Sequence, residues 1–162
     1  MELGEDNSRD YKIERLSGLG DLEGLKKLFE PTYSQEELDL ALINAIAFSK
    51  IEVAGYLLSL GADFSRDTYR GSYYAAHNSE LLGLKFSISN GVNVNINNGM
   101  LLNVSIIAAI NTRNVESVKW LFENGADSSL ISESSLEVAK KFGNSELQSL
   151  LAKWTVKNQR KD

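Results

Sequence analysis

The sequence predicts an all-α protein built as a stack of about five helix–turn–helix units. Three observations carry this prediction: an apolar segment ending in glycine recurs along the chain, a small residue recurs at a fixed distance before each glycine, and proline occurs only once. Helical segments therefore run almost without interruption by proline, which would break them. With 43% hydrophobic residues, a chain of 162 residues can bury the core of one domain.

The recurring string reads LLSLGAD, SISNGVN and WLFENGAD. Apolar residues with helical spacing precede the glycine of each copy, and Asn-Gly occurs in two of the three. We therefore expect each of these helices to end in a left-handed glycine cap. The three glycines are Gly61, Gly91 and Gly125.

A second recurrence precedes each glycine. Twelve residues before the glycines lie Ser49, Ser79 and Arg113, and four residues before those lie Ala45, Ala75 and Ala109. A small residue lets two helices cross at close range, so each unit is expected to contain a helix, a tight turn and a second helix. Degenerate copies at both ends, with Leu16 and Gly20 and with Ala139 and Gly143 in the equivalent slots, give five units 29 to 34 residues apart.

Units of this size cannot bury their own apolar face, which is why they stack. The alternative is a five-hairpin helical bundle with accidental spacing. We expect the repeat domain to cover residues 11–154, with units near 11–32, 36–65, 66–95, 98–129 and 130–154, between an acidic tail (1–10) and a basic tail (155–162). Trp120 shares an apolar helix face with Leu121 and Phe122, Trp154 ends the last apolar run, and both are expected in the core.

The segments SKIEVAGYLLSLGADFS, RNVESVKWLFENGADSS and SSLEVAKKFGNSELQSLLAKW resemble ankyrin repeats, and the resemblance covers roughly residues 11–154. It implies a solenoid of stacked helix–turn–helix repeats joined by short β-hairpin fingers. The first-helix motif Thr-Pro-Leu-His of that family is absent from every copy.

One finger is expected to be longer than the others. The interval from Gly91 to Ala109 is 18 residues, whereas that from Gly61 to Ala75 is 14. Within residues 90–104, valine and isoleucine alternate with asparagine up to the turn signal Asn98-Gly99. A period of two before such a turn predicts a small extended hairpin.

Composition excludes several classes of function. With 17 Lys plus Arg against 22 Asp plus Glu, the formal charge of -5 gives no electrostatic basis for gripping nucleic acid. The absence of cysteine excludes disulfides, thiolate metal sites and a cysteine nucleophile. No apolar run approaches the roughly 18 residues that span a bilayer, and the N-terminus is acidic where a secretory signal would be basic. We therefore expect no membrane partner and a cytoplasmic location.

The sequence also offers little for catalysis. His77 is the only histidine, and Glu80 follows it by one predicted helix turn, but two ligands make no closed metal site. By the resemblance, His77 occupies a solvent-facing slot before the inter-helix turn. No catalytic residue, metal or cofactor is expected.

The resemblance implies that partners bind to the fingers and to the slots just before each inter-helix turn. Tyrosine and arginine are favoured at protein-binding hot spots, although the tyrosines near Ser72 are equally well interpreted as filling the space beside that small residue. The expected partner-binding residues are Tyr69, Arg70, Tyr73, Tyr74, His77, Asn78, Met100, Leu101, Asn103, Asn111 and Thr112.

The sequence thus predicts a non-catalytic protein-binding module, monomeric when free. It would act as an adaptor or as a stoichiometric blocker of a protein with a basic face, and an immunity protein or antitoxin is the leading specific form. The alternatives are an enzyme of unrecognised type and a self-assembling structural repeat protein.

Overall fold

The computed structural model describes residues 8–158, and within that range the chain forms helices joined by short connections, without a β-strand. The predicted all-α class is therefore confirmed. The helices follow one another as α1 (Arg9–Leu19), α2 (Leu22–Phe29), α3 (Gln35–Ala47), α4 (Ile51–Ser59), α5 (Arg66–His77), α6 (Leu81–Ser89), α7 (Ile96–Thr112), α8 (Glu116–Glu123), the short 3-10 helix η1 (Ser128–Leu130), α9 (Glu133–Phe142) and α10 (Ser145–Asn158).

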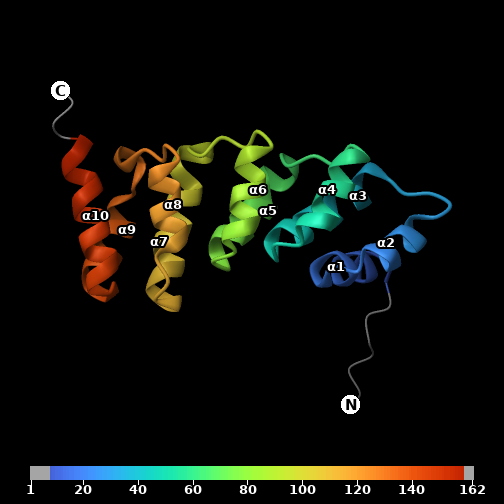
Figure 1. Cartoon of the computed structure of the whole chain (residues 1–162), viewed down its shortest axis with the longest axis horizontal. Coiled ribbons are helices and arrows are strands. Elements are labelled where there is room, and N and C mark those ends of the chain that lie inside the picture. The colour runs from blue at the N-terminus through green and yellow to red at the C-terminus, as the bar shows by residue number, and fades with distance from the viewer. Residues whose placement is uncertain (1–7, 159–162) are drawn as a thin grey trace, which may run out of the picture.

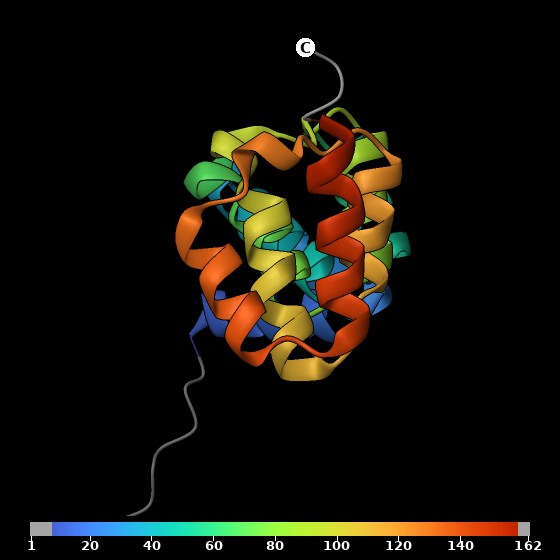
Figure 2. The ribbon, with the colours of Figure 1, turned by 90° about the vertical axis from the view of Figure 1, so that its left-hand side faces the viewer.

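The helices form consecutive pairs that succeed one another along the longest axis of the molecule (Figure 1). The odd-numbered helices pack against one another from α1 to α9, and we call them the inner row. The even-numbered helices form the outer row, in which the contacts between neighbours are sparser. Figure 2, viewed from the C-terminal end, shows α9 and α10 in front of the earlier pairs. This is a helical-repeat architecture.

The recurring glycines end helices of the outer row. Gly61, Gly91 and Gly125 have φ values of 95°, 102° and 94°, a left-handed conformation that glycine adopts without steric cost. The residue after each glycine donates its amide back into the last helical turn, as Ala62 N does to Leu57 O at 3.0 Å. Because this pattern is the Schellman cap, the sequence prediction of left-handed glycine caps is confirmed.

The recurring alanines lie in the last turn of the inner helices. The carbonyl oxygen of Ala45 accepts from Lys50 N at 2.7 Å, and that of Ala75 accepts from Glu80 N at 2.8 Å. The residue before each of these donors, Ser49 or Ser79, has a positive φ, and Arg113 repeats this conformation after α7. All the recurring alanines are buried, which leaves room for neighbouring helices to approach: Ala45, Ala75, Ala109 and Ala139.

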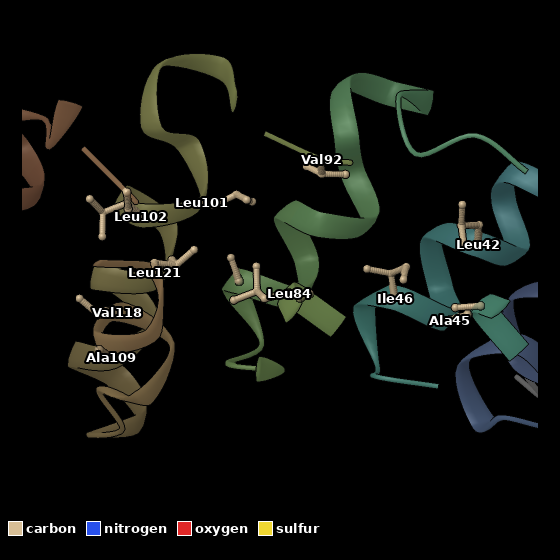
Figure 3. Close-up of a cluster of buried hydrophobic side chains, with 14 of the residues drawn as sticks. Leu42, Ala45, Ile46, Leu84, Val92, Leu101, Leu102, Ala109, Val118 and Leu121 are labelled. Atoms are coloured by element: carbon tan, nitrogen blue, oxygen red, sulfur yellow. The ribbon is translucent and has the colours of Figure 1, made fainter. Parts of the chain in front are cut away.

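One continuous hydrophobic core runs between the two rows (Figure 3). Inner helices contribute residues such as Leu42, Ile46 and Leu102, and outer helices contribute Leu84 and Leu121, all of which are almost completely buried. Both tryptophans pack against this core, as the sequence predicts. The indole of Trp154 stacks on the ring of Phe122 with 5.0 Å between centroids, so α10 is anchored to α8.

The predicted β-hairpin fingers are wrong. In the segment 90–104, Val92 is buried in the core, and α7 begins at Ile96 with a left-handed turn over residues 97–99, so no length of chain remains for two paired strands. The alternation of apolar residues with asparagine reflects anchoring of Val92, Val94 and Ile96 against the core, while the side chain of Asn93 caps the turn by accepting from Asn95 N at 2.8 Å.

Nor is this finger longer than its predecessor. Left-handed turns begin six residues after the glycine in both cases, at Asp67 after Gly61 and at Asn97 after Gly91. The end of the turn and the next left-handed cap are 10 positions apart from Tyr69 to Ser79, but 14 positions apart from Gly99 to Arg113. The four additional residues make about one more turn of α7.

At the N-terminus, α1 reaches into the segment expected to be a tail. Ser8 caps α1, and Arg9 already belongs to the helix, where it forms an ion pair with Glu37 of α3. The helix α10 likewise runs through residues 155–158. Residues 1–7 and 159–162, which make up the rest of both expected tails, lie outside the described part of the chain.

Candidate protein-binding groove

Three adjoining hollows lie along the inner row and together form what we call the groove. Their volumes are about 400, 400 and 490 Å³ from the N-terminal end onward. The first is lined by Asp10, Ser34, Glu36, Glu37, Leu40, Ile43, Arg66 and Asp67. The second is lined by Glu14, Leu40, Ile43, Asn44, Ala47, Phe48, Arg70, Tyr74, His77 and Asn78, and the third by Asp67, Thr68, Arg70, Tyr73, Tyr74 and Met100.

The hollows are continuous because neighbouring ones share residues. Leu40 and Ile43 of α3 line the first and second, and Arg70 and Tyr74 of α5 line the second and third. The groove thus crosses four consecutive inner helices, from α1 to α7. A surface of this extent, set on rigid helices, suits a segment of another macromolecule better than a small molecule.

An aromatic group on α5 forms the centre of the groove. The rings of Tyr73 and Tyr74 meet edge to face with 5.4 Å between centroids, and Tyr73 stacks on His77 at 6.2 Å. The guanidinium of Arg70 lies 5.7 Å from the ring centre of Tyr74. Both tyrosines are half-buried and His77 is exposed. Ring contacts of this kind hold the side chains in place before any partner arrives.

Arg70 is held as a cation at this centre. Its Nη1 donates to Oδ2 of Asp67 at 3.2 Å. Interaction with Tyr74, and then with Asp67, raises the pKa of the Arg70 guanidinium above its usual value.

Several of the predicted residues lie on the groove and others do not. Arg70, Tyr73, Tyr74, His77, Asn78 and Met100 line it. Tyr69 packs against the core, partly buried, at the end of the left-handed turn. Asn111 is exposed near the C-terminus of α7 but lines none of the three hollows.

Leu101 is a correction to the predicted set. Its side chain is 0% exposed and points into the core (Figure 3), so it cannot touch a partner. The residue appeared to belong to a finger only because a hairpin was expected at residues 90–104. Once that segment is helical, Leu101 lies on the core side of α7.

The side chains of Asn103 and Thr112 already have partners within the protein. The amide of Asn103 donates to Gly99 O and Leu130 O at 3.0 and 2.9 Å, and its oxygen accepts from Ser132 N at 2.8 Å. The hydroxyl of Thr112 donates to Ala108 O at 2.9 Å. Asn103 therefore ties α7 to the start of α9.

The sequence analysis missed the contribution of α3. Leu40, Ile43, Asn44 and Ala47 follow a spacing of three and four residues and line the groove, next to Phe48, which is 47% exposed. The other side of the same helix carries the core residues, so α3 is apolar on two sides. That double pattern is the signal that identifies these residues in the sequence.

Carboxylates surround the N-terminal part of the groove. Asp10, Glu14 and Glu36 are exposed there, and Glu37 is half-buried. The hydrogen bond from Arg9 lowers the pKa of Glu37 below its usual value, with help from the backbone amide of Ser34. Glu37 also completes the capping box of α3 with Ser34, so its position follows from the helix start.

The described part of the chain, residues 8–158, contains no group of three or more histidine, cysteine, aspartate or glutamate side chains that could hold a metal ion. None of its helices combines the length and the apolar character needed to cross a membrane.

Comparison with known proteins places the chain in no family: no protein-family model matches it, and no curated protein gives a significant match.

Proposed function

We propose that this chain is an ankyrin-type repeat protein that acts as a non-catalytic protein-binding module. The observation that carries the proposal is the groove, which is continuous over α1, α3, α5 and α7 and has a preformed aromatic and arginine centre. Tyrosine and arginine are enriched among the residues that dominate the binding energy of protein interfaces, and tyrosine buries a large surface with only two torsions to fix.

In this proposal the protein works by occupying the surface of its partner, either as an adaptor or as a stoichiometric blocker. A small acidic chain with a pI of about 5.0 suits the second role, and an immunity protein or antitoxin is its leading specific form. A cytoplasmic location remains a prediction of the sequence.

The test is site-specific photo-crosslinking. A benzophenone amino acid replaces Phe48 in the groove and, as a matched control, Lys119, which is exposed on the outer-row helix α8. In lysate of the source organism, we expect one partner to crosslink from position 48 and none from position 119. The double change Arg70→Ala, Tyr73→Ala should abolish this product while circular dichroism stays unchanged. Equal crosslinking from both positions would refute the proposal.

A further inference from the structure

The two halves of the groove differ in chemistry. The N-terminal half carries the exposed carboxylates of Asp10, Glu14 and Glu36, which we call the acidic section. The C-terminal half carries Tyr73, Tyr74 and Met100, which we call the aromatic section. The apolar side chains of Leu40, Ile43 and Phe48 connect the two.

The acidic section is not neutralised within the protein. Among residues 8–158, no basic group lies within 4.0 Å of the carboxylates of Asp10, Glu14 or Glu36. Arg9, which is next to Asp10 in the sequence, is paired with Glu37. The three carboxylates therefore project an uncompensated negative potential into the groove, to a range of about 8–10 Å at physiological salt.

The basic residues of the groove are engaged by other carboxylates. Arg70 is 3.2 Å from Asp67, and Arg66 lies 4.0 Å from both Asp39 and Asp67. Each guanidinium that lines the groove therefore has a carboxylate of the same protein within 4.0 Å. The charge of the groove as a whole is negative, and the negative charge is concentrated at one end.

We propose that the occupant of the groove is a segment of a partner protein that carries two or more lysine or arginine side chains at one end and a large apolar anchor at the other. Its basic end lies over the acidic section and its anchor lies between Tyr74 and Met100. This inference rests on the proposed protein-binding function and adds the chemistry and the direction of the bound segment.

The structure also sets the spacing within that segment. The acidic section lies on α1 and α3 and the anchor lies between α5 and α7, so the two are between one and three inner-helix spacings apart, or about 10–30 Å. An extended chain covers this distance with about three to nine residues between the basic pair and the anchor.

The test uses a phage library of random dodecapeptides selected on the full chain. We expect enriched peptides with paired basic residues and one large apolar residue at the stated spacing. Synthetic copies of these peptides should bind at least tenfold more weakly to the double variant Glu14→Lys, Glu36→Lys than to the unchanged protein. Their affinity for the unchanged protein should fall as the salt concentration rises. The matched control is Glu52→Lys, Glu116→Lys on the outer row, where both glutamates are exposed and the same charge change should alter affinity less than twofold.

Enriched peptides without basic residues, or an affinity unchanged by the groove reversal, would overturn the inference, as would the absence of any enriched peptide. Crosslinking of the bound peptides tests the proposed function separately from the ligand chemistry. If peptides of other composition still crosslink from position 48, the groove remains a binding site and only its ligand chemistry is wrong. If bound peptides crosslink from position 119 instead, both proposals fall.

Discussion

Two connections of the stack share one backbone and differ in almost every side chain. Residues 60–70 run from the end of α4 through a left-handed turn at the start of α5, and we call them the first connection. Residues 90–100 run from the end of α6 through a matching turn at the start of α7, and we call them the second connection. Both place a left-handed glycine at their second position and a left-handed turn of three residues at their eighth to tenth positions. The turns are Asp67–Tyr69 and Asn97–Gly99, and Asn97 Nδ2 joins them by donating to Thr68 O at 3.2 Å.

The residues that build the two turns have very different intrinsic costs. Asparagine and glycine tolerate the left-handed region, whereas the β-branched Thr68 and the bulky Tyr69 are strained there by about 1–2 kcal/mol each. The first connection also carries the charges of Asp63, Arg66, Asp67 and Arg70, and the second carries none.

This difference in residue type shows that the left-handed turns of the two connections have different physical causes. In the second connection the local sequence favours the turn. In the first, the packing of Tyr69 on the core and of the turn against its neighbour imposes it. Strain of this kind gathers at functional positions. The first connection supplies Asp67, Thr68 and Arg70 to the groove, whereas the second supplies Met100.

The largest effect is expected from Gly99→Ala. An added Cβ would lie 2.7 Å from Leu130 Cβ at a φ of 77°, so both overpacking and backbone strain apply. We expect a loss of about 2–4 kcal/mol in the free energy of unfolding by urea denaturation. The control is Gly55→Ala in α4, which has open space around it and should gain about 0.5–1 kcal/mol. Equal effects at both positions would contradict the tight turn.

Asn95 and Ser65 occupy the same place in the two connections but have different partners. The side chain of Asn95 accepts from Asp127 N at 2.8 Å and donates to Gly125 O at 3.1 Å, which ties the connection to the next pair. The hydroxyl of Ser65 instead donates to Oδ2 of Asp63, two residues earlier, at 2.6 Å, and so stays within its own connection. Asn95→Ala should cost about 1–2 kcal/mol and Ser65→Ala less than about 0.5, by thermal denaturation. A reversed order would show that the tie does not hold the pairs together.

A reciprocal exchange tests the strain directly. Thr68→Asn gives the first turn the residue of the second, and Asn98→Thr does the opposite. Both side chains are exposed, so lost packing contributes little. We expect a gain of about 1 kcal/mol from the first change and a similar loss from the second, measured by urea denaturation. If both changes destabilise, side-chain contacts rather than backbone strain govern the turn.

The smallest expected effect is on the pH dependence of the melting temperature. The Ser65 hydroxyl, together with its backbone amide, lowers the pKa of Asp63, whereas the second connection has the uncharged Asn93 in the same place. A carboxyl with a lowered folded pKa contributes stability above its unfolded value, about 3.9, and loses it as the pH falls through the folded pKa.

Asp63→Asn should therefore flatten the fall in melting temperature below about pH 4 and change little at pH 7, because asparagine still accepts the Ser65 amide. Asn93→Asp should introduce a new acid dependence. An unaltered acid profile in both variants would show that this turn does not couple protons to folding.

The repeat could be predicted from the sequence because its signals are local. The glycines at 61, 91 and 125 and the alanines at 45, 75 and 109 each satisfy a need of the nearest helix end, so their spacing reports helix pairs directly. The form of the connections could not be predicted in this way. Three successive left-handed residues have no sequence signature when they are Asp67, Thr68 and Tyr69, because tertiary contacts override the local preference.

The groove could be predicted only in part for the same reason. The groove residues of α5 could be predicted because tyrosine and arginine are favoured at protein-binding hot spots and His77 is the only histidine. Leu40, Ile43 and Phe48 were missed, since an apolar residue in a helical pattern is assigned to the core by default, and only the packing shows which of two apolar stripes faces inward. Leu101 is the opposite case, because it was predicted to contact a partner and is buried in the core.

The main contacts of the stack join helices of the same pair or of neighbouring pairs. Stability in such a chain is a sum over adjacent units, so an end pair can open and close without the middle, and amide exchange should slow from the termini toward α5. A ligand that lies along α1, α3, α5 and α7 would hold together units that otherwise open independently. Its binding would then slow amide hydrogen exchange throughout these units, including at amides that the ligand does not touch.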